Sequence, residues 1–349
     1  MDMKVVGNRI AKYRKIHNYT QEGLAEKLMI TPQAVSRWEN GHTLPETNLL
    51  VDLCDILHIT VDQLLSKQGV LPIQEDEIPH ELSNVQKLWD HYSENWYQRY
   101  RTKEIIDEIA NNPASTFHHT VWEQIKDSFP TLRGKKVCVP SSGDNRAVFA
   151  FAVLGAKVTS CDISPRQLEN ARKIAEENHW DIEFICDDTR YLTKLPSETF
   201  DLVYTSNGVH VWIDDLYSMY KSIYRILKKN GSSIMYDVHP FCRPFDDSEL
   251  VLKIRKPYDW IGPFEDDDDG ITNGVFTYAW RVQDFCNAII KSGLQMKCMN
   301  EMYAEYGTFW FCQREDESYI SKEEKDKYSD WNTNPYAALP QWIMIQSYK

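Results

Sequence analysis

Small and acidic residues follow successive strand-like runs at intervals that suit a ligand containing a ribose. The first run leads into the loop Pro140-Ser141-Ser142-Gly143-Asp144-Asn145, whose small side chains allow a ligand to approach the backbone. The second run, KVTSCD, ends about twenty residues further on in Asp162, where a carboxylate can accept hydrogen bonds from both hydroxyls of a ribose. The loop and the acid together predict a nucleoside-binding site.

Two further strand ends supply polar groups to the same predicted site. The third run ends in Asp187-Asp188-Thr189, where a side-chain oxygen can accept a hydrogen bond from an adenine amino group. The fourth run, FDLVYTSNG, opens a loop toward His210 and Trp212. Because open α/β sheets bind ligands outside the carboxyl ends of their strands, we expect these residues to gather at one edge of a sheet.

The elements that must position these residues alternate in type from Lys135 to Val238. The strand-like runs KKVCVP, KVTSCD, IEFICD, FDLVYTS and SSIMYDV are separated by helix-like runs, which predicts a parallel sheet wrapped by helices. Aromatic-rich helices are expected before this region, from Val85 to Ile125. Late strands are expected at Val275–Trp280 and Gln341–Gln346, and the acidic insert Glu265–Asp269 is predicted to be a loop.

The N-terminal region has apolar residues at helical spacing from Val5 to about Ser66. This pattern predicts an all-α module of five short helices. Thr31 is a good N-cap for the third helix, with Pro32 at its first position. We expect Val35 and Trp38 to point into the core, while four side chains project outward: Gln33, Ala34, Ser36 and Arg37.

Several of these outward side chains suit DNA. Gln33 and Arg37 are of the kinds that contact base edges in a major groove, and Gln21 lies where a helix start can meet a phosphate. The first forty residues hold seven Lys and Arg against four Asp and Glu, a local charge of +3, whereas the whole chain carries -13. Any DNA contact therefore belongs to the N-terminal region.

A polar stretch, KQGVLPIQEDEIPHELSN, separates the two regions and predicts a linker, because it has two prolines and no periodicity. We expect a first domain at residues 1–66, the linker at 67–84 and a second domain at 85–349, whose residues 85–130 form a helical cap. A chain of 349 residues, 42% of them hydrophobic, can build the two cores that this division requires.

Composition also indicates which partners and which cellular compartment to expect. No run reaches the roughly eighteen apolar residues that a membrane-spanning helix needs, so we expect no membrane partner and a cytoplasmic location. The eight cysteines are scattered without any Cys/His spacing suited to zinc. We therefore expect reduced cysteines and no metal site.

The run TQEGLAEKLMITPQAVSRWENGHTLPETNLLVDLCDILHITVDQLL resembles the helix-turn-helix family of the Cro and phage-repressor (XRE) proteins. The combination of TQ, LA, VSRWENG and the Pro45 loop carries the resemblance. It implies that the helix Thr31–Asn40 is a recognition helix, that double-stranded DNA is the partner, and that a homodimer binds two half-sites. A module kept only for dimerisation or protein binding is the alternative, because the near-neutral charge offers few phosphate contacts.

The second region resembles the class I S-adenosylmethionine-dependent methyltransferases from Lys135 to Pro240. The resemblance implies a Rossmann-like α/β fold and S-adenosylmethionine as cofactor, with S-adenosylhomocysteine as product. Gly143 matches the central glycine of the family's first loop, Asp162 its ribose acid and Ile163 the apolar neighbour of adenine. Asp188 and Thr189 match the adenine-edge pair, Thr205 to Asn207 match the loop beside the amino acid part, and LKKNG matches the turn before the fifth strand.

Three positions depart from the family's pattern: Val139 replaces the usual strand-end acid, and Ser141 and Asn145 replace glycines. The methionine ammonium would then be held by carbonyls, by Asn207, or by aromatic residues of the N-terminal helices such as Trp96 and Tyr97. Because of these departures, an alternative function stays open: a transcription regulator whose methyltransferase-like domain only senses a ligand. A sheet that binds NAD is a weaker alternative, because the loop lacks GxGxxG.

Methyl transfer needs proximity and, for some acceptors, a base. His210 and His239 are the candidate bases, since histidine titrates near neutrality. A nucleic-acid methyltransferase is an alternative, yet TSNGVHVW follows the fourth strand where a base-holding Pro-Pro-aromatic run would be expected. The predicted function is therefore transfer to a small molecule, joined to DNA binding and transcription regulation.

Overall fold

The computed structural model describes residues 3–16, 19–57, 61–65, 84–245, 252–265, 275–311 and 320–349. The chain divides into two compact units, Met1–Pro79 and His80–Lys349. The division falls within the stretch predicted as a linker, most of which lies outside the described residues. None of the helices in the described ranges is long and apolar enough to cross a membrane.

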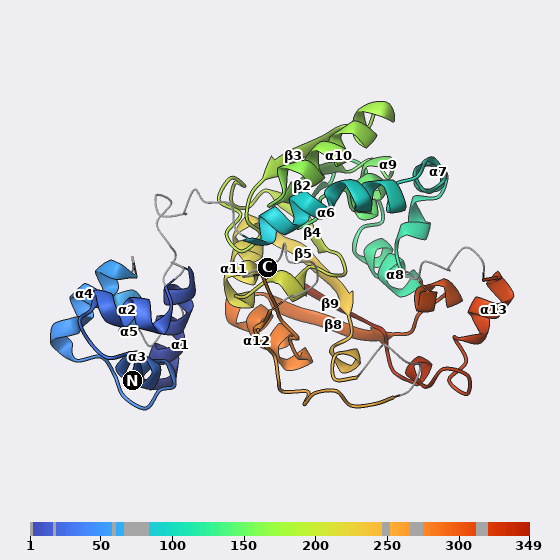
Figure 1. Cartoon of the computed structure of the whole chain (residues 1–349). Helices are drawn as coiled ribbons and strands as arrows, with labels where there is room; N and C mark the ends of the chain where they lie inside the picture. Colours follow the sequence, from blue (N-terminus) through green and yellow to red (C-terminus); the bar gives the residue numbers. More distant parts are fainter. Residues whose placement is uncertain are drawn as a thin grey trace. The chain divides into compact units, whose positions relative to one another are not determined.

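The first unit is a bundle of short helices (Figure 1). They are α1 (Met3–Ile16), α2 (Gln21–Lys27), α3 (Pro32–Glu39), η1 (Thr47–Leu49), α4 (Leu50–Ile56) and α5 (Val61–Leu65). Their apolar positions form one core that includes Ile10, Leu24, Val35, Trp38 and Leu53. The five predicted helices are therefore present, and Val35 and Trp38 point inward as expected.

Local sequence explains where α2 and α3 begin and how tightly the bundle packs. The side chains of Thr20 and Thr31 cap the two helices by accepting hydrogen bonds from the backbone N–H groups of Gly23 (3.0 Å) and Ala34 (3.3 Å). Gly7 lies where α1 contacts the end of α3, and a Cβ placed there would be 2.1 Å from the Trp38 carbonyl oxygen. Only glycine allows this approach of the two backbones.

The second unit is built on a seven-stranded sheet with the order β3-β2-β1-β4-β5-β9-β8. The strands are β1 (Lys136–Pro140), β2 (Lys157–Asp162), β3 (Ile182–Cys186), β4 (Phe200–Thr205), β5 (Leu227–Val238), β8 (Gln295–Met302) and β9 (Trp342–Tyr348). The strands β1 to β5 are parallel, and β9 is antiparallel to both neighbours, β5 and β8. A separate hairpin pairs β6 (Phe264–Glu265) with β7 (Phe276–Thr277).

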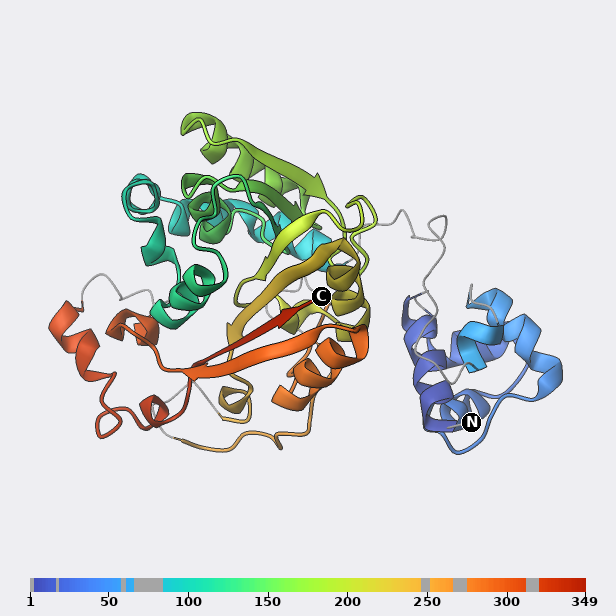
Figure 2. The same ribbon diagram turned by 180° about the vertical axis from the view of Figure 1, so that it is seen from behind.

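Helices cover both faces of this sheet, as Figures 1 and 2 show from opposite sides. One face packs against α7 (Lys103–Asn111), α8 (His119–Ser128), α9 (Arg146–Val153) and α10 (Pro165–Glu177), and α6 (Asn84–Tyr100) lies against α10. The other face packs against α11 (Leu216–Ile226) and α12 (Val282–Ser292). Successive residues of β1 belong to the hydrophobic cores on opposite faces of the sheet, since Val137 and Val139 face one side and Cys138 faces the other.

The predicted α/β class with an N-terminal all-α module is confirmed. The region predicted as a helical cap contains α6, α7 and α8, together with the short helix η3 (Pro113–Thr116). The run LKKNG differs from its prediction as a turn, because β5 already begins at Leu227 and the pairing with β4 shifts register between Phe200 and Leu202. Of the acidic insert, Glu265 belongs to β6 and the rest lies outside the described residues. Three further short elements, η6 (Gly307–Phe311), α13 (Lys322–Lys327) and η8 (Pro335–Ala338), connect β8 to β9.

Candidate functional site

The strand order of the second unit reverses between β1 and β4, since β2 and β3 lie on one side and β5 on the other. Ligands of open α/β sheets bind at such a switch point, outside the carboxyl ends of the strands. The loop Ser141–Asn145 follows β1, and Ser206 and Asn207 follow β4. The sequence-predicted loops therefore flank the expected ligand position.

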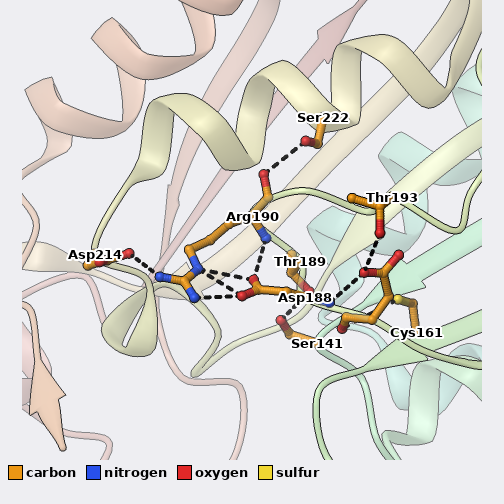
Figure 3. A network of polar contacts seen from close by, with 9 residues as sticks. Ser141, Cys161, Asp188, Thr189, Arg190, Thr193, Asp214 and Ser222 are labelled. Atoms are coloured by element: carbon orange, nitrogen blue, oxygen red, sulfur yellow. Dashed lines mark hydrogen bonds and ion pairs between the residues drawn. The ribbon is translucent and has the colours of Figure 1, made fainter. Parts of the chain in front are cut away.

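The loop after β1 turns through two residues in the left-handed region, Ser141 (φ 48°) and Gly143 (φ 47°). A side chain on Gly143 would collide with Gln167 of α10, because a Cβ there would lie 2.9 Å from Gln167 Oε1. Ser141 replaces a glycine at a strained angle, and its hydroxyl donates to Thr189 Oγ1 at 2.6 Å (Figure 3). This hydrogen bond ties the loop after β1 to the loop after β3.

Asp162, the predicted ribose acid, ends β2 and is buried. Its carboxylate accepts a hydrogen bond from the backbone N–H of Ser164 at 2.8 Å. Burial raises the pKa of Asp162 to about 7, against the opposing effect of hydrogen bonds from the backbones of Ser164 and Gly143. A buried carboxylate with spare acceptor capacity suits a diol ligand.

The predicted adenine-edge pair follows β3, and Figure 3 shows its surroundings. Both carboxylate oxygens of Asp188 pair with Arg190, because Nε donates to Oδ1 at 3.1 Å and Nη2 donates to Oδ2 at 2.6 Å, and Arg190 Nη1 reaches Asp214 Oδ1 at 2.9 Å. Burial lowers the pKa of Arg190, but the two carboxylates outweigh this effect and raise it. An adenine amino group would have to share the Asp188 carboxylate with Arg190.

The other predicted cofactor residues lie on the same edge. Thr205 ends β4 and is buried, Asn207 is exposed two residues later, and Ile163 follows Asp162 half-buried. Trp96 and Tyr97 lie half-buried on α6, where Trp96 contacts Trp89 edge to face with ring centroids 6.1 Å apart.

His210 and His239, the predicted bases, are both buried and bonded within the fold. His210 Nδ1 lies 2.5 Å from Asp237 Oδ2, and its Nε2 lies 2.9 Å from the hydroxyl of Tyr220. His239 Nε2 lies 2.9 Å from Glu301 Oε1, and its Nδ1 accepts from the backbone N–H of Phe241 at 3.1 Å. Burial lowers the pKa of His239 despite its contact with Glu301. These contacts favour positioning roles over proton transfer to a substrate.

The pair of His210 and Asp237 connects the loop after β4 with the end of β5. Asp237 accepts from the backbone N–H groups of Gly208 (2.9 Å), Val238 (2.7 Å) and His210 (3.3 Å). Burial raises the pKa of Asp237, but the bond to His210 outweighs this effect and lowers it. The loop that contains Asn207 is thereby fixed in place.

Sequence reasoning missed three residues that surround the predicted site. Arg101, just after α6, pairs with Asp144 in the loop after β1, with Nη2 and Oδ1 3.2 Å apart. Asp90 of α6 accepts from the hydroxyl of Ser164 at 2.6 Å, beside Asp162. The acidic Asp144 inside a loop otherwise made of small residues is the one local signal, whereas both contacts, from Arg101 and to Asp90, depend on tertiary structure.

One group of metal-ligating side chains occurs within the described ranges: His118, His119 and Glu305. His118 already uses both ring nitrogens, because Nε2 contacts the Tyr303 carbonyl at 3.0 Å and Nδ1 accepts from the Thr120 N–H at 3.2 Å. His119 contacts Glu305 through Nδ1. These three side chains therefore already bond to other groups within the fold.

In the first unit, the predicted DNA-contacting residues divide into two groups. Gln33 and Arg37 are exposed one helical turn apart on α3, as is Thr31 at its start, and Ala34 and Ser36 are half-buried between them. Gln21 instead donates to Glu39 Oε2 at 2.6 Å, and Glu39 also pairs with Arg14, with Oε1 and Nε 2.5 Å apart. The exposed face of α3 is thus available to a ligand, whereas Gln21 also holds α2 to the end of α3.

Two family models match these units. One, described as helix-turn-helix, matches residues 10–64, and the other, described as a methyltransferase domain, matches residues 140–235. The second range runs from the end of β1 into β5 and contains the loops described above. The sequence-based prediction of both families is confirmed. The chain thus joins a unit that matches the helix-turn-helix model to a unit that contains a match to the methyltransferase domain.

Several known proteins are similar to parts of this chain. The uncharacterized HTH-type transcriptional regulator YazB of Bacillus subtilis is 38% identical over 64 residues, which are 18% of this chain and 93% of YazB. The chain therefore belongs to the helix-turn-helix family of transcription regulators. The uncharacterized methyltransferase YbaJ of the same organism is 31% identical over 141 residues, 40% of this chain, and the match spans only 55% of YbaJ. The fold is also similar to an S-adenosylmethionine-dependent methyltransferase from Mesorhizobium loti, at 20% identity over 69% of this chain and 100% of that chain, with a TM-score of 0.46.

Proposed function

We propose that the protein is a cytoplasmic methyltransferase that uses S-adenosylmethionine to methylate a small molecule, and that it binds double-stranded DNA through its N-terminal unit as a homodimer. The observation that carries the enzymatic part is Asp162, buried at the carboxyl end of β2 beside the strained loop after β1. An acid at this position suits a ribose, and the small residues of the neighbouring loop let a ligand approach the backbone.

The residues present fit such a cofactor. Two buried polar atoms at the switch point, Asp144 Oδ2 and Thr205 Oγ1, lack hydrogen-bond partners in the part of the chain that the structure describes. Gly143 lets the loop after β1 pack against Gln167 of α10, where a Cβ would collide. When bound, S-adenosylmethionine supplies a methyl group that its sulfonium makes electrophilic. Asp162 would accept the ribose hydroxyls, and Asp188 and Thr189 would lie at the adenine edge.

The chain's own contribution to methyl transfer is then orientation. His210 and Asp237 fix the loop beside Asn207, and Trp89 contacts Trp212 edge to face with centroids 5.7 Å apart, so aromatic side chains connect α6 to the same loop. Holding an acceptor in line with the methyl group supplies most of the acceleration that such a reaction needs. With both histidines bonded within the fold, we assign no base, which favours an acceptor that is already nucleophilic.

A small molecule is the better acceptor, because the net charge of -13 falls outside residues 1–70. Residues 1–70 contain eight Lys and Arg and eight Asp and Glu, so the remainder carries the whole excess and would repel a polyanion. DNA binding instead rests on α3, where Gln33 and Arg37 are exposed on one face. Arg37→Ala should weaken DNA binding and leave cofactor binding unchanged.

A regulator that only senses the cofactor is the second candidate, because Val139 stands where the family has an acid. Radiolabelled S-adenosylmethionine, incubated with the full chain and either a metabolite extract or DNA, separates the candidates. Transfer of the label to small molecules would support the proposed enzyme. Transfer of the label to DNA would show that nucleic acid, and not a small molecule, is the methyl acceptor. Cofactor binding with no transfer to either pool would favour the sensor.

A further inference from the structure

Asp144 is an acidic residue in the loop after β1 to which the family resemblance gives no role. Its side chain is only 3% exposed, and that of Arg101 only 6%. Arg101 approaches Asp144 Oδ1 at 3.2 Å and donates through Nε to the Asp144 backbone carbonyl at 2.5 Å. Arg101 also donates to the Tyr100 carbonyl at 2.7 Å, so the guanidinium is fixed and holds the carboxylate in one orientation.

This pairing satisfies only half of the Asp144 carboxylate. Its Oδ2 is buried, with no hydrogen-bond partner among the residues that the structure covers, and Thr205 Oγ1 is in the same condition. Asp144 follows β1 and Thr205 ends β4, so the two atoms flank the switch point from its two sides. A buried acceptor without a donor is costly, and a ligand that brings N–H groups would remove that cost.

The charges around Asp144 favour a cationic ligand group. Asp144 and Asp90 both raise the pKa of Asp162, so three carboxylates lie close together at the ends of β1 and β2. Arg101 pairs with one of the three. Burial also raises the pKa of Asp144 itself, against the effect of Arg101. A positive group placed among these carboxylates would relieve their mutual repulsion.

We propose that Asp144 binds the α-ammonium group of the cofactor's methionine part through Oδ2, with Arg101 as the residue that positions the carboxylate. The assignment rests on the proposed function. It gives the chain a substitute for the strand-end acid that Val139 replaces, five residues further along the chain in the loop after β1. Thr205 Oγ1 is a second acceptor for the same ammonium group on the β4 side.

Isothermal titration calorimetry on the full chain tests the assignment with two ligands. S-adenosylmethionine carries the ammonium group, whereas 5′-methylthioadenosine keeps the adenosine and the sulfur but lacks the amino acid part. Asp144→Asn should raise the Kd for S-adenosylmethionine about tenfold or more, the effect of losing a hydrogen bond to a charged group. It should leave the Kd for methylthioadenosine within about twofold. Asp127→Asn, which changes an exposed aspartate of α8, is the matched control and should alter neither.

The outcomes separate this assignment from the proposed function. If wild type binds neither ligand, the proposed function itself fails. Equal weakening of both ligands by Asp144→Asn, or no weakening of either, would overturn the assignment while leaving the cofactor in place. Should Asp144→Asn not fold, the wild type still decides, because a desamino analogue of S-adenosylhomocysteine must bind about tenfold more weakly than S-adenosylhomocysteine. Equal affinities for those two compounds would refute the assignment.

Discussion

The substitution Asp162→Asn should make the stability of the second unit less dependent on pH. Asp162 is buried, and its pKa in the folded chain is raised from 3.8 to about 7. The folded state therefore holds a proton that the unfolded chain releases between these two values, so wild-type stability falls as the pH rises from about 4 to about 7. Asparagine has no such proton.

The expected size follows from the shift. Each pKa unit corresponds to about 1.4 kcal/mol, so the two units between pH 5 and pH 7 correspond to about 3 kcal/mol. Relative to wild type, Asp162→Asn should gain about 3 kcal/mol of unfolding free energy between pH 5 and pH 8, without ligand. Urea unfolding followed by tryptophan fluorescence measures this difference. Asp181→Asn, at an exposed aspartate just before β3, should show no such gain.

A constant difference between variant and wild type at the two pH values would refute the reasoning. It would mean that the Asp162 carboxylate ionises normally in the folded chain, through hydration or a cation beside it. The proposed stabilisation of a ribose by a desolvated carboxylate would then lose its physical basis.

Three further substitutions test other parts of the account. Gly143→Ala should destabilise the second unit by about 1–3 kcal/mol and weaken cofactor binding, because the residue has a φ of 47° and a Cβ would meet Gln167. Gly134→Ala is the control: its φ is also positive, at 75°, but a Cβ there would have nothing within 4 Å, so the difference between the two variants isolates the effect of the collision. Gly7→Ala should unfold the first unit and abolish DNA binding in a gel-shift assay without affecting cofactor affinity, whereas Gly23→Ala, whose nearest contact is 3.4 Å away, should retain DNA binding. His210→Ala should lower the unfolding free energy by about 3–5 kcal/mol because it leaves Asp237 buried without its partner; loss of turnover with unchanged stability would instead identify His210 as a base.

The features that could be predicted from sequence are those that local patterns determine. Thr31 and Pro32 start α3 as predicted, and the alternation of strand-like with helix-like runs and the acid that ends β2 locate the loop edge that contains Asp162. Such signals lie within one element or between successive elements, where periodicity and capping act.

What escaped prediction depends on contacts between distant parts of the chain. Arg101 and Asp144 are 43 residues apart, and His210 and Asp237 are 27 residues apart, so no spacing rule joins them. The strand predicted at Gln341–Gln346 overlaps β9 (Trp342–Tyr348), yet its antiparallel place between β5 and β8 follows from the packing of the whole sheet. The bonds of His210 to Asp237 and of His239 to Glu301 likewise join distant parts of the chain, so no local pattern predicts them.

Calorimetric titration of the full chain with S-adenosylmethionine tests the central claim most directly. The account predicts binding at one site per chain and loss of that binding in Asp162→Ala, with methyltransferase-unit folding confirmed by an unchanged far-ultraviolet spectrum. Absence of binding to the wild-type chain would contradict the claim that this edge of the sheet is a cofactor site. Undiminished binding by Asp162→Ala would contradict the placement of the ribose.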